Sequence, residues 1–433
     1  MAGPAIRAWE FARALSTDYQ VTLVSSHPVT CSGEGFQILH EEDPLLQELW
    51  KSVDVILTQT VTLDLAYRIW RQGAYLLVDA YDPCPLEVLE MMRECPVKEA
   101  SLTFFATIHQ LNFAFSLADG ILCASEKQRD LWIGYLLGQQ LISPALYRMD
   151  ASLRHLIATV PFGLHGVPPT RTGPGLRKKY GFEPDDAVLL WGGGIWNWFD
   201  PLTLIQAIKL IHTSRKEVKL VFMGTQSPDP HVPAMSMCLK AIELAEKEGL
   251  LDKAVFFNAG WIPYQERQNF LLDATLGVST HFDHLETRYA FRTRILDYIW
   301  AGLPIITTEG DSFADLVRSR QLGYVAPYEN PEALAAAILA LLDDKKQQNS
   351  IRTHLISLRK EFDWNHVVKP IQSMIENLRL KKPKTSLWNL IRVMSRLIFS
   401  RIRDKGCIGC LQTLYKKCTN RLFQINFQRN TSS

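Results

Sequence analysis

The sequence lacks any run of about 18 consecutive apolar residues, the length with which a helix spans a bilayer. No internal repeat and no low-complexity tract appears. The eight cysteines, at positions 31, 84, 95, 123, 238, 407, 410 and 418, are scattered, and several have the apolar neighbours of small buried thiols. These absences argue against a transmembrane, repeat or disulfide-scaffold protein. They favour a globular body in a reducing, cytoplasmic compartment.

Motifs of cofactor and metal chemistry are also missing. No Gly-x-Gly-x-x-Gly follows a predicted strand with an acidic residue about 20 positions later, which counts against a nicotinamide-dependent oxidoreductase. No Asp-x-Asp metal signature is evident, and Cys407-x-x-Cys410 with Cys418 has no fourth ligand at zinc-site spacing. We therefore expect neither a metal nor a resident cofactor.

Charge is distributed unevenly along the chain. From residue 381 onward there are 12 Lys and Arg against one acidic residue, whereas the preceding 380 residues carry 35 basic and 44 acidic residues. Ser386–Arg403 is amphipathic at helical spacing, with a polar stripe formed by Asn389, Arg392, Arg396, Ser400 and Arg403. We predict that this basic tail binds an anionic membrane surface, so that the protein is peripheral on the inner face of the membrane. Packing of the helix against the acidic body is the alternative.

Short apolar strands alternate with helical patterns, as in parallel α/β proteins. The predicted strands are Val21–Ser25, Val53–Leu57, Tyr75–Val78, Gly120–Cys123 and Ile157–Val160, then Val188–Trp191, Lys219–Met223, Val255–Phe257, Leu276–Ser279, Ile305–Thr307 and Tyr324–Ala326. The loop His165–Gly175, with three prolines and three glycines, separates the two series. We expect two Rossmann-like domains, 1–165 and 176–363, a crossover helix 364–380 and the basic tail 381–433. A ligand cleft is expected at the carboxyl ends of the strands.

The first domain lacks one expected strand. Met1-Ala-Gly3-Pro4 is typical of a glycine loop that opens a helix, and such a loop normally follows the central strand of the sheet. No residues are left to form that strand. Because an empty central position would leave the backbone of both neighbours unpaired, we expect the native start to lie upstream of Met1, with an altered fold as the alternative.

The segment Phe291–Ile306, FRTRILDYIWAGLPII, carries the clearest functional pattern. It predicts a helix from about Arg292 to Trp300 that ends at Gly302, before a buried strand. Arg292 and Arg294 offer planar cationic donors to phosphate oxygens beside a helix N-terminus. Their spacing of two places them on different faces of the helix. One is therefore expected to face a nucleotide diphosphate and the other to pair with a carboxylate such as Asp297.

A glycine loop follows the first strand of the second series. Trp191-Gly-Gly-Gly is succeeded by a loop that contains two tryptophans, which are costly to expose unless they line a pocket or an interface. Because glycine lets the backbone approach a ligand closely, we predict that this loop lines the ligand cleft. The residues concerned are Gly193, Gly194, Asn197, Trp198 and Asp200. A tight turn with ordinary packing is the alternative.

Polar residues also follow other strands. Asp79 and Asp82 end a strand of the first series and are predicted to bind hydroxyl groups of a ligand, although Asp82 before Pro83 suits a helix N-cap equally well. His281 is predicted to point into the same ligand cleft. Its neighbours Asp283 and His284 are interpreted as loop residues rather than metal ligands.

The order of helix, Gly302 and Pro304, with Asp297 five residues before the glycine, resembles the nucleotide-sugar-binding region of glycosyltransferase family 4. The resemblance extends from the first residues to about Leu380. It implies the GT-B fold and retaining transfer of a sugar from a nucleotide-diphosphate sugar to a glycan or lipid-linked acceptor, in cell-surface polysaccharide biosynthesis. The family's second acidic residue would stand at position 289, where this chain has Tyr289, and the nearest acidic residue is Glu286.

The resemblance also implies roles for individual residues. Glu286 or Asp297 would contact hydroxyls of the sugar donor, and Gly3, Arg7, His281 and the glycine-loop residues would line the same donor site. Asp79 and Asp82 would bind hydroxyls of the acceptor. The family often places an Arg and a Lys in the glycine loop, but this chain has neither between Trp191 and Leu202. A non-catalytic nucleotide-sugar-binding protein is therefore the alternative function, followed by a Rossmann oxidoreductase.

Overall fold

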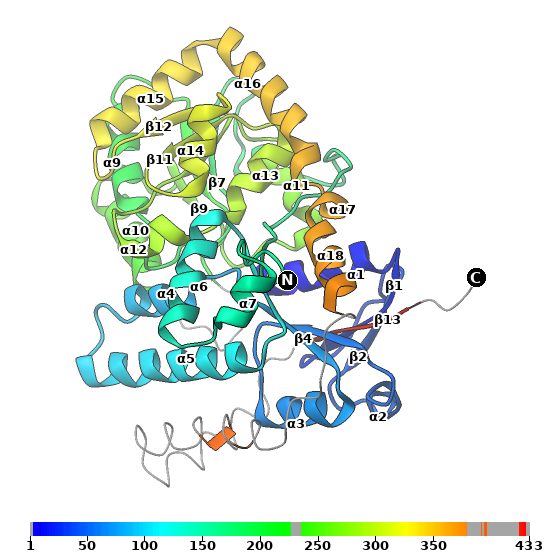
Figure 1. Cartoon of the computed structure of the whole chain (residues 1–433). Helices are drawn as coiled ribbons and strands as arrows, with labels where there is room; N and C mark the ends of the chain where they lie inside the picture. The colour runs from blue at the N-terminus through cyan, green and yellow to red at the C-terminus, as the bar shows by residue number, and fades with distance from the viewer. Residues whose placement is uncertain (1–2, 227–234, 379–390, 392–393, 396–423, 430–433) are drawn as a thin grey trace. The chain divides into compact units, whose positions relative to one another are not determined.

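The computed structural model describes residues 3–226, 235–378, 391, 394–395 and 424–429. It divides into two compact units (Figure 1). The first unit comprises residues 4–161 and the described residues from 364 onward, and the second comprises residues 162–363. Each unit is built on one sheet whose strands are connected by helices. The predicted α/β class with two Rossmann-like domains is confirmed.

The second unit contains a wholly parallel sheet of six strands in the order β12-β11-β10-β7-β8-β9. Its strands are β7 Ala187–Trp191, β8 Val218–Phe222, β9 Val255–Phe257, β10 Leu276–Ser279, β11 Ile305–Thr308 and β12 Gly323–Ala326. Its helices are α8 Leu176–Tyr180, α9 Pro201–His212, α10 Ser236–Lys247, α11 Arg267–Leu271, α12 Leu285–Tyr289, α13 Thr293–Ala301, α14 Ser312–Ser319, α15 Pro331–Asp343 and α16 Lys345–Leu358, with 3₁₀ turns η1 Tyr264–Glu266 and η2 Arg359–Phe362.

Local sequence explains where these elements begin and end. β10 and β11 are buried at every residue, as expected for strands covered on both faces. Asp200, Asp311 and Asn330 accept a hydrogen bond from a backbone N–H three residues later and so cap α9, α14 and α15. α13 ends at Gly302, whose φ of 67° lies in the left-handed region, so the predicted stop is confirmed.

The first unit contains a sheet of seven strands in the order β2-β1-β13-β3-β4-β5-β6. Its strands are β1 Tyr19–Ser25, β2 Gln37–His40, β3 Val55–Thr58, β4 Tyr75–Asp79, β5 Gly120–Cys123, β6 Ile157–Thr159 and β13 Gln424–Arg429. Its helices are α1 Gly3–Leu15, α2 Leu45–Leu49, α3 Leu63–Gln72, α4 Cys84–Met91, α5 Val97–Leu117, α6 Glu126–Gly138, α7 Pro144–Met149, α17 Trp364–Val367 and α18 Lys369–Leu378.

No strand of the described chain precedes α1, as expected, and the central position of this sheet is filled by a strand from the other end of the sequence. β13 lies between β1 and β3 and runs antiparallel to both, whereas the other pairs in the sheet are parallel. Its backbone pairs with residues 19–24 on one side and 55–57 on the other. The unpaired backbone groups that a gap would create are therefore satisfied by the C-terminal segment, which was predicted only as part of a helical tail.

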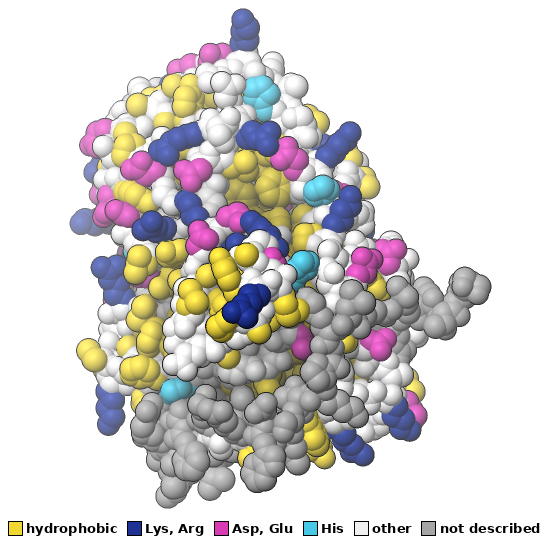
Figure 2. Space-filling view, viewed as in Figure 1, with side chains coloured by type: hydrophobic (Ala, Val, Ile, Leu, Met, Phe, Trp, Pro, Cys, Tyr) yellow, Lys and Arg dark blue, Asp and Glu magenta, His cyan; other side chains and the backbone are white. Residues whose placement is uncertain are grey.

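The amphipathic helix predicted in the tail lies mostly outside the described residues, as do Cys407 and Cys410. Of its described residues, Ile391 is exposed and Met394 packs against the hydrophobic core of the first unit. On the face drawn in Figure 2, basic and acidic side chains of the described residues are interspersed. No helix in the described part of the chain is both long and apolar enough to cross a membrane.

Candidate functional site

The residues of the second unit that were predicted to bind the donor follow two neighbouring strands. β7 is followed by the loop Gly192–Gly194, and β10 by the segment that contains His281. The two strands pair side by side in the sheet. α13, which carries Arg294 in its first turn, comes next in the chain after α12. Ligands of parallel α/β sheets bind at such carboxyl ends.

The glycine loop presents backbone donors. The N–H of Gly192 donates to the Tyr298 hydroxyl at 2.8 Å. Gly193 has a φ of 89°, in the left-handed region that favours glycine. Within the part of the chain that the structure describes, the N–H groups of Gly193 and Gly194 have no acceptor. Successive free N–H groups around a left-handed residue form a concavity that suits an anion.

Arg294 is a buried cation beside this loop. Its side chain is packed against the rings of Trp191 and Phe199, with the guanidinium carbon 4.3 and 4.1 Å from their centroids. Its Nη2 donates to the carbonyl of Gly194 at 2.9 Å, whereas Nη1 is buried and has no hydrogen-bond partner. Burial lowers the pKa of Arg294 to about 9, so the group remains charged at neutral pH.

Arg294 forms no ion pair with a carboxylate among residues 3–226, 235–378 and the other described positions. Burying such a charge is unfavourable unless an anionic group compensates for it. The structure therefore leaves Arg294 with one unused donor and an uncompensated charge.

Arg292 is placed differently. Its two terminal nitrogens donate to both carboxylate oxygens of Glu286 at 2.8 and 2.6 Å, and Nη2 also reaches Thr287. Asp311 lies 3.9 Å from its Nε. Both Arg292 and Glu286 are buried, so this pair neutralises the two side chains that were predicted to contact the donor. The expected role of Arg292 at the diphosphate and of Glu286 at a hydroxyl is therefore not supported by their placement.

Asp297 does not pair with Arg294. Its Oδ1 accepts from Nε of Arg267 at 3.0 Å, and a third of its side chain remains exposed. Arg267 is itself packed between two aromatic rings, with its guanidinium carbon 3.7 Å from the centroid of Tyr264 and 4.4 Å from that of Trp300. The carboxylate is thus held in one orientation with its second oxygen available. No spacing rule pointed to Arg267, because it lies on another helix.

His281 is fully buried and has no hydrogen bond at either ring nitrogen. Burial holds its pKa well below the usual value, and the nearby Arg292 contributes in the same direction. Asp311 lies 3.7 Å from its Nε2. His284 caps α12 by accepting from Thr287 N–H. Among the described residues, no three His, Cys, Asp or Glu side chains form a group that could hold a metal ion.

The other polar residues of the glycine loop have structural partners. Asn197 Oδ1 accepts from the N–H of Met237 at 3.1 Å, and so caps α10, whose own N-cap residue has no side-chain bond. Asp200 is buried and caps α9, and burial raises its pKa. The rings of Trp196 and Trp198 stack 5.5 Å apart at 4°. The packing alternative thus describes Asn197 and Asp200 better than the predicted donor contacts.

In the first unit, Arg7 and Asp79 are engaged with each other. Two nitrogens of Arg7 donate to the two carboxylate oxygens at 2.8 and 2.9 Å, and Arg7 also donates to the carbonyls of Val160 and Pro161. Both side chains are buried. This arrangement ties α1 to the ends of β4 and β6, and it leaves neither residue presented to a ligand, contrary to both expectations.

The remaining predicted residues of the first unit occupy the ends of elements. Gly3 is the first residue of α1. Asp82 is half-buried and precedes α4, whose N-cap residue is Pro83. The N-cap alternative for Asp82 is therefore wrong.

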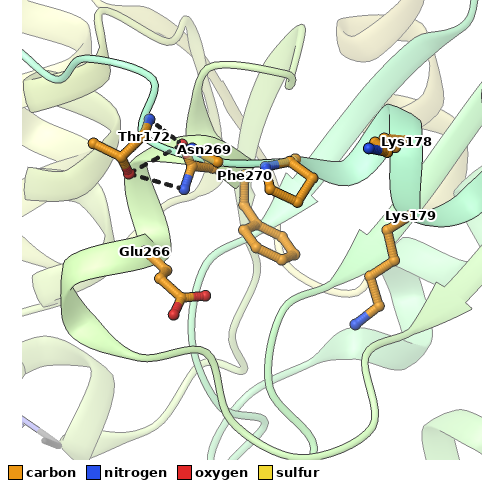
Figure 3. Close-up of a pocket in the computed structure, with 9 residues that line it drawn as sticks. Thr172, Lys178, Lys179, Glu266, Asn269 and Phe270 are labelled. Atoms are coloured by element: carbon orange, nitrogen blue, oxygen red, sulfur yellow. Dashed lines mark hydrogen bonds between the residues drawn. The ribbon is translucent and has the colours of Figure 1, made fainter.

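A separate hollow with a cavity volume of about 630 Å³ lies elsewhere in the second unit (Figure 3). It is lined by Thr172, Gly173, Pro174, Gly175, Lys178, Lys179, Glu266, Asn269 and Phe270. Figure 3 shows Asn269 hydrogen-bonded to Thr172, whose N–H donates to Asn269 Oδ1 at 2.8 Å. None of the predicted site residues lines this hollow.

Comparison with known proteins agrees with this architecture. Residues 186–344 match the family model described as "Glycosyl transferases group 1". A search of curated proteins found no match. Among solved structures, sucrose-phosphate synthase (tll1590) from Thermosynechococcus elongatus is 16% identical, with a TM-score of 0.57 over 88% of this chain and 94% of that chain.

Two further solved structures are similar over most of their length. Anabaena Alr3699/HepE, in complex with UDP and glucose, is 14% identical, with a TM-score of 0.59 over 88% of this chain and 96% of that one. WaaG, a glycosyltransferase involved in lipopolysaccharide biosynthesis, is 14% identical, with a TM-score of 0.56 over 86% and 95%. Residues 186–344 therefore match the model of glycosyl transferases group 1, and the chain has the GT-B fold of these solved structures.

Proposed function

We propose that the protein is a retaining glycosyltransferase that moves a sugar from a nucleotide-diphosphate sugar to a glycan or lipid-linked acceptor in cell-surface polysaccharide biosynthesis. The observation that carries the proposal is Arg294, a buried cation with an unused Nη1 and no carboxylate partner in the described part of the chain. It lies beside the loop whose Gly193 and Gly194 N–H groups are free. A diphosphate would supply the missing charge and the missing acceptors.

The chemistry of transfer explains why such a group is needed. As the glycosidic bond breaks, negative charge builds on the departing diphosphate and the sugar becomes oxocarbenium-like. Fixed donors aimed at that charge lower the barrier because they need no reorganisation during the reaction. Arg294 and the two glycine N–H groups would perform this role without any metal ion. The exposed oxygen of Asp297, steadied by Arg267, would accept hydrogen bonds from hydroxyls of the donor.

A panel of nucleotide sugars tests the donor proposal. UDP-sugars come first, because Alr3699/HepE forms complexes with UDP, with UDP and glucose, and with UDP-glucose. A ligand present at about 100 Kd adds roughly 2.7 kcal/mol to the stability of the unit that binds it. For a unit of about 200 residues this corresponds to a rise in Tm of about 5–11 °C. No rise with any nucleotide sugar, and no donor turnover, would reject the proposal.

The acceptor and the membrane are proposed on separate grounds. Asp82 remains our choice for an acceptor contact, since Asp79 is engaged by Arg7.

The basic tail is proposed to bind anionic membrane through its charge. Replacing Arg392, Arg396 and Arg403 by Gln should reduce sedimentation with anionic vesicles, while neutral vesicles serve as the control. Equal sedimentation of both proteins would assign the segment a packing role, as the contact of Met394 with the core suggests.

A non-catalytic nucleotide-sugar-binding protein is the second candidate. It is favoured by the absence of Lys and Arg between Trp191 and Leu202, and by Tyr289 in place of a carboxylate. Binding of a nucleotide sugar with neither hydrolysis nor transfer would support this function over the first.

A further inference from the structure

Tyr298 joins three backbone groups at the point where β7 and β10 diverge. Its side chain is fully buried. Its hydroxyl accepts a hydrogen bond from the N–H of Gly192 at 2.8 Å. Its single proton is shared between the carbonyl oxygens of Leu190, at 2.9 Å, and Val278, at 2.8 Å. Burial raises the pKa of Tyr298 to about 12, so the phenol keeps this proton at neutral pH.

The hydroxyl extends the sheet beyond its last backbone pair. β7 and β10 pair at Leu189 with Leu276 and at Leu190 with Gly277, and no pairing follows toward the loop in the described chain. Tyr298 bonds the next backbone groups of both strands, those of Leu190, Gly192 and Val278. The start of the glycine loop is thus fixed to the sheet by a side chain rather than by a neighbouring strand.

Two glycines make room for the ring. A Cβ at Gly277 would lie 2.5 Å from ring atoms of Tyr298, which real contacts do not show. A Cβ at Gly192 would lie 3.2 Å from the ring, closer than most real contacts. The close approach of Tyr298 to the backbone of both strands therefore depends on the absence of side chains at these positions.

The same helix holds the other end of the loop. Arg294 lies one turn before Tyr298 on α13, so the two side chains project from one face. Arg294 donates to the carbonyl of Gly194, and Tyr298 accepts from the N–H of Gly192. Only Gly193 separates the two attachments. The orientation of the free N–H groups of Gly193 and Gly194 is thereby set at both sides.

We propose that Tyr298 is a positioning residue for donor binding. Its hydroxyl fixes the glycine loop so that the free N–H groups of the loop and the guanidinium of Arg294 can bind the same diphosphate. The proposal rests on the proposed function. Tyr298 touches neither the donor nor the reacting atoms; it acts through Gly192. Loss of the hydroxyl would release the first attachment while leaving the ring packed in place.

Tyr298→Phe tests this with inorganic pyrophosphate, a probe that needs neither a known base nor a known sugar. We expect its Kd to rise about tenfold, which is the scale of losing one positioning hydrogen bond. The KM for an identified nucleotide sugar should rise with it, and hydrogen exchange at residues 192–194 should accelerate. Tyr324→Phe is the matched control, because it removes a hydroxyl that is hydrogen-bonded to Gln347 at 2.9 Å in the same unit. It should change neither the Kd for pyrophosphate, nor the KM, nor the hydrogen exchange at residues 192–194.

Each result has a defined meaning. A Tyr298→Phe protein with a lower Tm but unchanged pyrophosphate affinity and KM would overturn the proposal, since the hydroxyl would then be structural only. If the variant does not fold, wild-type exchange decides, because the Gly192 N–H should exchange more slowly than those of Gly193 and Gly194. Equal rates would overturn the proposal. If the wild-type protein binds neither pyrophosphate nor any nucleotide sugar, the proposed function is rejected. Slow exchange at Gly192 in that protein would show that Tyr298 still fixes the loop, so the two failures can be told apart.

Discussion

Arg292 and Arg294 stand two residues apart, yet their replacement should have opposite consequences. Arg292→Met removes the partner of Glu286, whose carboxylate is buried. Leaving one charge of a buried pair uncompensated costs about 3–5 kcal/mol. In a unit of about 200 residues each kcal/mol lowers Tm by about 2–4 °C, so the second unit should melt about 6–20 °C earlier.

Arg294→Met should leave Tm unchanged or raise it. The substitution removes a buried cation that has no carboxylate partner in the described chain, while the methionine keeps an apolar stem against Trp191 and Phe199. Donor turnover should fall instead. Losing one preorganised donor at a developing charge lowers kcat/KM about 10²-fold, or about 2.7 kcal/mol in the barrier.

Scanning fluorimetry and steady-state donor hydrolysis measure both effects on the same samples. Arg294→Lys serves as the control for charge alone, because an ammonium cannot reproduce the planar guanidinium contacts with Gly194 and the two rings. The reasoning is refuted if Arg294→Met destabilises the unit as much as Arg292→Met does and still turns over the donor at the wild-type rate.

Three further outcomes follow from buried groups and from the sheet. Because burial lowers the pKa of His281, the stability that its neutral form contributes is present above about pH 6.5 and is lost as the pH falls below that value. His281→Gln should therefore flatten this part of the curve of Tm against pH, and an unchanged slope would show that His281 is not the group that titrates. Arg7→Met should destabilise the first unit by about 3–5 kcal/mol in urea titrations, whereas adding Asp79→Leu should recover most of the loss; failure of the double variant to recover would contradict an ion-pair origin. Deleting residues 424–433 should abolish cooperative melting of the first unit while the second unit still melts, and two intact transitions would show that β13 is dispensable.

The spacing of apolar residues and the positions of glycine and proline in the sequence predict most of the strands and helices of the second unit. Each predicted strand overlaps a strand of the structure, and the helix stop at Gly302 is at its predicted position. These features depend on local rules, namely buried strands and a residue with positive φ. β2, with only one fully buried residue among four, has no such signal.

The partners of charged side chains could not be predicted in the same way. Spacing predicts different roles for Arg292 and Arg294, but it does not identify the groups with which charged residues pair. Glu286 on α12 pairs with Arg292, and Arg267 on α11 pairs with Asp297, the carboxylate expected to pair with one of the two arginines. The hydroxyl of Tyr298 is a similar case, since the sequence shows a tyrosine in an apolar helix and gives no sign that two distant glycines admit its ring. Tertiary contacts decide these roles.

The position of β13 affects the order in which the protein folds during synthesis. Residues 4–161 leave the ribosome first, but the strand that joins β1 to β3 is translated about 260 residues later. At about 5–20 residues per second, the two halves of that sheet wait on the order of 10–50 s for their central strand. The second unit draws its whole sheet from one continuous segment, so it can fold before the first unit is complete. In this protein the unit that is synthesised first finishes last, and its exposed strand edges must be protected from aggregation in the interval.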